Sequence, residues 1–171
     1  MSSTPVAATR ISTAELSWLL SLRPGRPATL VAAALDLPLP LPDRSPEASV
    51  LEDLLADGRA QERRGEVLPR GESAVVGDAL TSATALISVG DEQGLAALLA
   101  VGADRVLLLA PAGAAVEVAA LDAATTPGAA VAALASSVGQ RARVMVALAD
   151  AEITAVEPGP QLADRVDGLL R

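Results

Sequence analysis

The chain has 171 residues, a formal net charge of −8 and 51% hydrophobic residues, a composition that predicts a folded domain with a sizeable core. All 13 positive charges are arginines, and the sequence contains no cysteine, histidine or lysine. These absences exclude disulfides and ordinary zinc sites, and they leave a serine nucleophile without a basic partner. The acidic balance disfavours a nucleic-acid surface, because phosphate binding depends on clustered cations.

The beginning of the chain predicts a flexible N-terminus over residues 1–10, followed by a single α+β domain over residues 11–171. A first helix starts at Ser12, whose spacing to Glu15 is that of a capping box, with Ile11 as the hydrophobic staple. The only tryptophan, Trp18, lies near the apolar stripe of this helix. It is interpreted as a core residue, with a binding hot spot as the alternative.

The middle of the helical part, residues 11–82, is harder to interpret. Residues 29–35 are compatible with a short strand or a helical turn. Leucine and proline alternate over residues 37–42, which favours an extended strip docked on the domain over an SH3-type ligand. A second helix is expected from Ser45 as N-cap to Gly58. Its carboxylates are interpreted as a solvated acidic face, not a magnesium site.

The only locally basic segment, residues 59–70, predicts a hairpin turning at Arg64 and Gly65. Helices followed by a hairpin resemble a winged helix in outline, so a DNA-binding regulator is one alternative function. Glu62 and Glu66 dilute the basic charge, and the preceding helix is acidic, which disfavours contact with phosphate. A further helix is expected over residues 72–82, with Val75, Val76, Ala79 and Leu80 as its apolar face.

The second part of the domain, residues 83–171, begins with four short apolar runs separated by connections rich in Gly, Asp or Pro. Connections this short cannot hold a crossover helix, so the strands must form an antiparallel meander covered by helices. A helix ending at Gly139, two more strands and a last helix over residues 162–170 complete the α+β prediction. The expected strands are 84–89, 95–101, 105–110, 115–121, 143–148 and 153–156.

The sequence offers no motif for chemistry. The glycines do not space as a phosphate-binding loop, and no carboxylate pair stands out as an acid and base. We therefore expect no catalytic residues, no cofactor and no metal site, and a protein that is not an enzyme. No signal peptide and no apolar run of membrane-spanning length is evident, so we expect a cytoplasmic protein without membrane insertion.

Five segments of the chain together show a family resemblance. They are residues 12–20 (STAELSWLL), 51–60 (LEDLLADGRA), 83–89 (ATALISV), 95–101 (LAALLAV) and 104–109 (DRVLLL). In this order they resemble the ESX (type VII) secretion-associated EspG family of actinobacteria. The resemblance implies a cytoplasmic chaperone that keeps a helical PE–PPE substrate pair soluble for export.

The connections between the strands are the candidate partner-binding positions, because loops on a rigid sheet commonly carry binding groups. Besides the chaperone and the DNA-binding regulator, a self-associating structural protein is a third hypothesis, with a homodimer formed through the edge of the meander or the alanine-rich helix. The candidate contact residues are Asp91, Glu92, Gln93, Ala103, Asp104 and Ala112.

Overall fold

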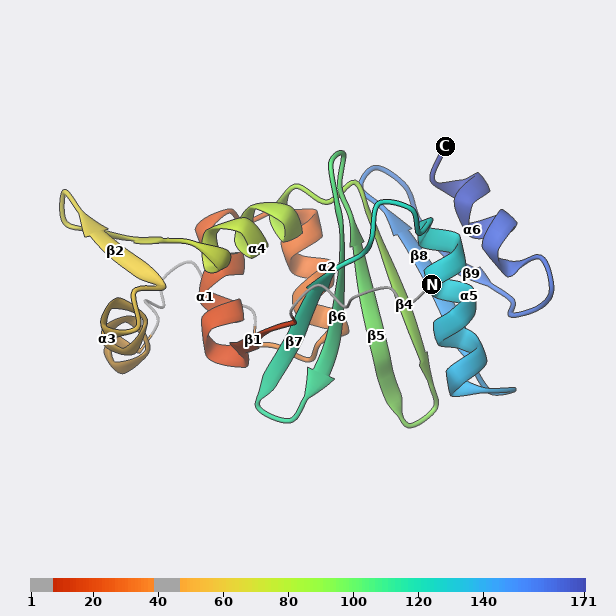
Figure 1. Cartoon of the computed structure of the whole chain (residues 1–171), viewed down its shortest axis with the longest axis horizontal. Coiled ribbons are helices and arrows are strands. Elements are labelled where there is room, and N and C mark those ends of the chain that lie inside the picture. The colour runs from red at the N-terminus through yellow and green to blue at the C-terminus, as the bar shows by residue number, and fades with distance from the viewer. Residues whose placement is uncertain (1–7, 39–46) are drawn as a thin grey trace.

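The computed structural model of the chain describes residues 8–38 and 47–171, and its main feature is a seven-stranded antiparallel sheet (Figure 1). The α+β class and the antiparallel meander predicted from the sequence are confirmed. The strands are β1 (Thr9–Ser12), β4 (Ala85–Asp91), β5 (Gly94–Val101), β6 (Val106–Ala112), β7 (Ala115–Ala120), β8 (Arg143–Leu148) and β9 (Ile153–Val156).

The strand order in this sheet is β1-β7-β6-β5-β4-β8-β9. The four meander strands follow one another in space as they do in sequence, because their connections are too short for any other path. Helix α5 (Pro127–Val138) then crosses one face of the sheet and returns the chain to the far side, where β8 pairs with β4. Both edges of the meander that self-association was expected to use are therefore occupied, by β1 and by β8.

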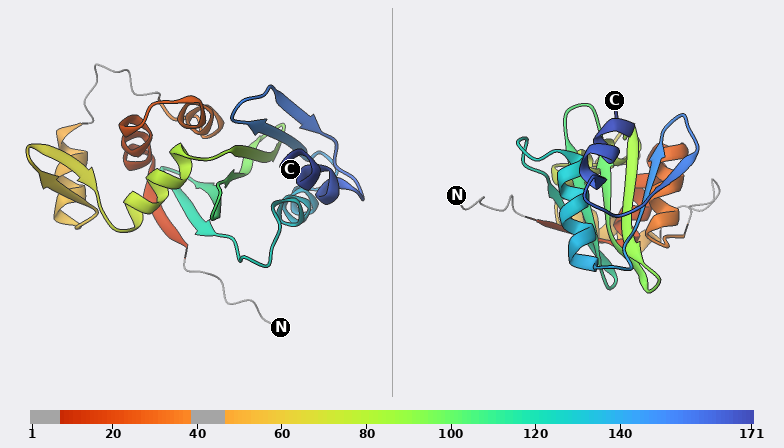
Figure 2. Two further views of the ribbon diagram at one scale, coloured as in Figure 1. Left: turned by 90° about the horizontal axis from the view of Figure 1, so that it is seen from above. Right: turned by 90° about the vertical axis from the view of Figure 1, so that its right-hand side faces the viewer.

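Helices cover the two faces of the sheet (Figure 2). Helices α1 (Thr13–Leu22), α2 (Arg26–Ala34) and α4 (Glu72–Thr81) enclose one core, which includes Leu86 and Leu98 of the sheet. Helices α5 and α6 (Leu162–Leu169) enclose a second core on the opposite face, which includes Ile87 and Leu99. Successive residues of a strand thus place their side chains in different cores, as the alternation of side chains along a strand requires.

A smaller unit projects from the end of the molecule near α1 (Figure 1). It consists of helix α3 (Ala48–Ala56) and a separate hairpin of β2 (Ala60–Arg63) and β3 (Glu66–Pro69), and we call it the α3–hairpin unit. A third cluster holds this unit to α1, and in it Trp18 and Leu19 pack with Leu54 and Ala60. Trp18 is buried there, as its interpretation as a core residue predicted.

Several local expectations need correction or completion. Residues 9 and 10, placed in the flexible terminus by sequence, belong to β1, where Ile11 points into the first core. Residues 29–35, left open between strand and helix, lie in α2 and the turn after it. The expected N-cap at Ser45 and most of the leucine–proline strip lie outside the described residues.

The hairpin and the remaining helices agree closely with expectation. The turn at Arg64 and Gly65 has positive φ at both residues, 56° and 83°, as a tight two-residue hairpin turn demands. Helix α5 is capped by Thr126 and ends at Gly139. None of the helices in the described ranges is long and apolar enough to cross a membrane.

Candidate partner-binding surface

The six candidate contact residues do not form one site. Asp91, Glu92 and Gln93 belong to the β4–β5 turn, and Ala112 ends β6 at the same end of the meander. Ala103 and Asp104 lie in the β5–β6 connection, at the opposite end (Figure 1). An up-and-down meander places successive connections at opposite ends of the sheet, so one partner surface cannot include all six residues.

The β4–β5 turn is held by contacts within the chain. Asp91 Oδ1 accepts a hydrogen bond of 2.7 Å from the backbone N–H of Gln93, which stabilises the turn itself. Glu92 pairs with Arg143 of β8 at 3.0 Å, with both side chains well exposed. An exposed pair of this kind contributes little to stability. This turn is therefore a solvated connection in which the carboxylates of Asp91 and Glu92 already have partners.

A hollow lies elsewhere, between α1, α4 and β3. We call it the α1–α4 groove, and its volume is about 510 Å³. Most of its lining is apolar, and Leu22 in the groove wall is 40% exposed. Arg23 and Asp78 form an exposed ion pair of 2.7 Å at its rim. The lining residues are Leu19, Leu22, Arg23, Glu66, Val67, Leu68, Pro69, Ala74, Gly77, Asp78 and Thr81.

A glycine sets the depth of this groove. A Cβ at Gly77 of α4 would lie 3.3 Å from Cδ2 of Leu19 on α1, closer than nearly all real contacts of this kind. The missing side chain therefore allows α4 to pack closely on α1. Leu22 follows the apolar stripe of α1 by one turn, but it is exposed because no described element covers it at this end of the helix.

A second hollow of about 330 Å³ lies on the other side of α4, next to the β5–β6 connection. Ala103 and Asp104 line it together with Val75, which is 46% exposed. The sequence placed Val75 on the buried face of this helix, and the structure corrects that assignment. Helix α4 is thus a ridge between two hollows, and Ala103 and Asp104 are the predicted residues that lie beside it.

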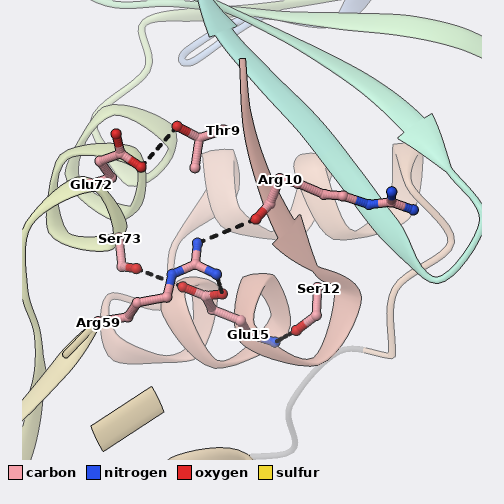
Figure 3. Close-up of polar contacts among 7 residues, drawn as sticks. All are labelled: Thr9, Arg10, Ser12, Glu15, Arg59, Glu72 and Ser73. Carbon is pink, nitrogen blue, oxygen red and sulfur yellow. Dashed lines mark hydrogen bonds and ion pairs between the residues drawn. The ribbon is translucent and has the colours of Figure 1, made fainter. Parts of the chain in front are cut away.

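A buried polar cluster fixes the walls of the groove (Figure 3). Ser73 Oγ of α4 donates a hydrogen bond of 2.6 Å to Oε1 of Glu15 on α1, and Arg59 contacts Oε2 of Glu15 at 2.9 Å. Arg59 also donates to the backbone oxygen of Arg10 in β1, at 3.4 Å. We call these three side chains the Glu15 cluster, and it joins α1, α4, β1 and the start of the hairpin.

The pKa of Glu15 is raised above its ordinary value. Burial is the main cause, and the nearby carboxylate of Asp57 adds to it, whereas the hydrogen bond from Ser73 and the charge of Arg59 oppose it. The sequence assigned Glu15 to a capping box. Ser12 Oγ does accept the N–H of Glu15, at 3.1 Å, but the carboxylate points to Ser73 and Arg59 instead of back to the cap.

Sequence reasoning missed the groove because α1 is distant in sequence from the β3–α4 segment that completes it, and each element alone reads as an ordinary helix or hairpin. Within the described ranges, no three His, Cys, Asp or Glu side chains come together in a way that could hold a metal ion. A scan against protein-family models and a search of curated proteins found no match to this chain.

Proposed function

We propose that this protein is a non-enzymatic adaptor that holds a helical segment of another protein in the α1–α4 groove. The observation that carries the proposal is a groove of about 510 Å³ that combines apolar lining residues, among them Leu19, Leu22 and Val67, with charged groups at its rim. Amphipathic helices bind in such grooves by inserting side chains from one face, spaced at three and four residues. The resemblance to EspG proteins suggests the partner class, helical type VII secretion substrates of the PE–PPE kind, bound in the cytoplasm before export.

Charge and rigidity favour this use of the groove. Its α1 and α4 walls are joined by the Glu15 cluster, so these two walls are preformed and a partner does not have to order them. The groove rim carries both signs, with Glu66 and Asp78 beside Arg23, which favours recognition of a particular register over general adhesion.

The DNA-binding alternative has less support. It would use Arg63 and Arg64 at the hairpin tip, but the adjacent α3 exposes Glu52, Asp53 and Asp57 to solvent. Phosphate would be repelled by this helix. Arg59, at the base of the hairpin, is engaged by Glu15.

The test is capture of partners by the tagged full chain in its native host, followed by mass spectrometry. We expect a small helical protein in stoichiometric amount with the unchanged chain and a loss of at least about tenfold with Leu22→Asp. Leu169→Asp is the matched control, because Leu169 of α6 is similarly exposed, at 37%, on the other helical layer.

Three other outcomes would contradict the proposal. A stoichiometric partner retained equally by Leu22→Asp would place its binding outside the groove. Salt-sensitive duplex binding abolished by Arg63→Ala with Arg64→Ala would favour the regulator. A concentration-dependent dimer, with no other protein bound, would favour self-association.

A further inference from the structure

Among the residues that the structure describes, the last strand of the sheet, β9, has a neighbouring strand on one side alone. It pairs with β8 and stands at the end of the strand order, so no other strand of residues 8–38 and 47–171 lies on its outer edge. A strand edge presents unpaired backbone N–H and C=O groups that can pair with another chain. The identity of the open groups follows from the register of the sheet.

The register shows which residues of β9 point outward. Ala149 donates its N–H to Thr84 O at 2.9 Å, so by alternation residues 147, 145 and 143 of β8 bond to β4. The intervening Val144 and Val146 then bond to Val156 and Thr154 of β9. Ile153 and Ala155 therefore direct their N–H and C=O groups away from the sheet, and both residues are exposed.

Arginine side chains donate hydrogen bonds to the backbone at both ends of this edge. The guanidinium of Arg26, from α2, donates to the backbone oxygen of Ala151. Arg165, from α6, donates to that of Glu157 at 3.4 Å. The carbonyls at the two ends are thereby satisfied, and the open part of the edge is limited to Ile153 and Ala155 between them.

An apolar surface adjoins the open part. Ile153 is 50% exposed and Met145 38% exposed, and both line a groove of about 280 Å³ whose wall is formed by Leu30, Ala33 and Ala34 of α2. The helices of this face cover the meander and Ala147 of β8 but leave Met145 and Ile153 exposed, so an apolar side chain placed beside Ile153 would be shielded from water.

The charges around this edge indicate what kind of strand fits. Asp150, Glu152 and Glu157 are all exposed, and none forms a salt bridge with another described residue. Arg26 and Arg165 offset part of this charge at the ends. A second copy paired by a two-fold axis would bring six carboxylates together around a strand of four residues, whereas a cationic strand would be attracted.

We propose that β9 accepts an added strand from another protein, an extended segment with an apolar centre and Lys or Arg on both sides. This is a second binding surface, distinct from the α1–α4 groove, and it does not depend on the function proposed above. Backbone hydrogen bonds to Ile153 and Ala155 supply the affinity, and the side chain beside Ile153 and the flanking charges supply the selectivity.

The test uses a capped peptide of five alternating valine and threonine residues with two arginines at each end. With saturating peptide we expect amide hydrogen exchange at Ile153 and Ala155 to slow at least about fivefold, while Thr154, already bonded to β8, stays unchanged. Peptides with glutamates at the ends, or with N-methyl groups on alternate central residues, are the matched controls and bind at least about tenfold more weakly.

Two sets of variants probe the same contact from the protein side. Ala155→Pro removes an outward N–H without touching the ladder to β8, so it weakens peptide binding about tenfold, whereas Ala155→Val retains it. Glu152→Gln with Glu157→Gln weakens binding of the arginine peptide about two- to fivefold at low salt, as expected for exposed pairs. Circular dichroism checks that each variant folds.

Three results would overturn the proposal. Equal binding of the arginine and glutamate peptides, or no binding of either at millimolar concentration, would show that the β9 edge does not accept a cationic added strand. Protection of Ile153 and Ala155 that grows with protein concentration and needs no peptide would identify a second copy as the occupant. Shifts of the Met145 methyl without amide protection would indicate a helix on the groove instead.

Discussion

At the residue scale, the Glu15 cluster is the most consequential feature. Glu15 is 1% exposed and Arg59 28% exposed, so the carboxylate is removed from water while its cationic partner is partly hydrated. Removing a partner from a buried pair is costly because it leaves an uncompensated charge. The cluster is therefore asymmetric, and its two members should not respond equally to mutation.

A double-mutant cycle tests this asymmetry. We expect Arg59→Ala to lower the free energy of unfolding by about 3 kcal/mol at neutral pH, because it leaves the ionised Glu15 buried without its cationic partner. The same change in a Glu15→Gln background should cost about 1 kcal/mol, since no buried charge is left behind. Urea unfolding of the four proteins measures both values. Equal costs in the two backgrounds would show that Arg59 acts through packing alone.

The raised pKa of Glu15 predicts a pH dependence of stability. The folded state binds the proton of Glu15 more tightly than the unfolded state does, so the stabilising contribution is fully present below the ordinary value of 4.5. It is lost as pH rises through the raised pKa of the folded state. The difference in unfolding free energy between the unchanged chain and Glu15→Gln should therefore shift in favour of the unchanged chain as pH falls through that window. A difference that is constant with pH would contradict the assignment.

At the element scale, the contact between α5 and α6 depends on the first turn of α5. Asp167 of α6 accepts hydrogen bonds from the backbone N–H of Gly128 at 2.7 Å and from the hydroxyl of Thr126 at 2.8 Å. A carboxylate at a helix N-terminus is favourable because unpaired N–H groups point toward it. Gly128 allows this approach, because a Cβ there would lie 2.2 Å from the backbone oxygen of Ala163.

Two helical glycines should consequently respond in opposite directions to alanine. Gly128→Ala forces α6 away from α5, and we expect a loss of about 1–3 kcal/mol of unfolding free energy. Gly168→Ala, with no atom within 4 Å of the new Cβ, should stabilise the chain by about 0.5–1 kcal/mol through its helix propensity. Thermal unfolding followed by circular dichroism gives both values. An unfolding free energy that Gly128→Ala leaves unchanged would show that α5 and α6 leave room for a side chain at this position.

At the scale of the whole molecule, the three hydrophobic clusters differ in size. Two large ones cover the faces of the sheet, while the α3–hairpin unit is held by a small one around Trp18 and Leu54. Units with few buried apolar contacts open at lower free energy than the core of a domain. The α3–hairpin unit should therefore open before the sheet does.

Trp18 offers a direct measurement of this opening, because it is the only tryptophan and lies in the contact between α1 and the unit. We expect its fluorescence to change at lower urea concentration than the circular dichroism of the sheet and the remaining helices. Amide exchange should likewise be fastest in β2 and β3 and slowest in β4 and β5, the central strands. Coincident fluorescence and circular dichroism transitions, together with equal amide exchange in the hairpin and the central strands, would show that the molecule unfolds as one unit.

The candidate site was predictable only in part. Loops on the sheet were the natural candidates. Ala103 and Asp104 line a hollow beside α4, and Asp91 and Gln93 line another of about 260 Å³ beside Val138 of α5. The α1–α4 groove was not predictable, because Leu22, Val67 and Gly77 each have an ordinary local explanation. Glu15 was misassigned for a similar reason, since its capping-box spacing is a local signal and its partners Ser73 and Arg59 are distant in sequence.

The sequence by itself determined most of the elements of this protein, because hydrophobic period, caps and turn residues act within a few positions of one another. The runs of the meander, the Arg64–Gly65 turn and the cap at Thr126 are all of this local kind. Tertiary structure alone decided the place of β8 beside β4, the strand formed by Thr9–Ser12, and the surfaces left bare at the α1–α4 groove and β9. Those outcomes depend on which apolar faces meet across long stretches of chain, and a local pattern does not record its distant partner.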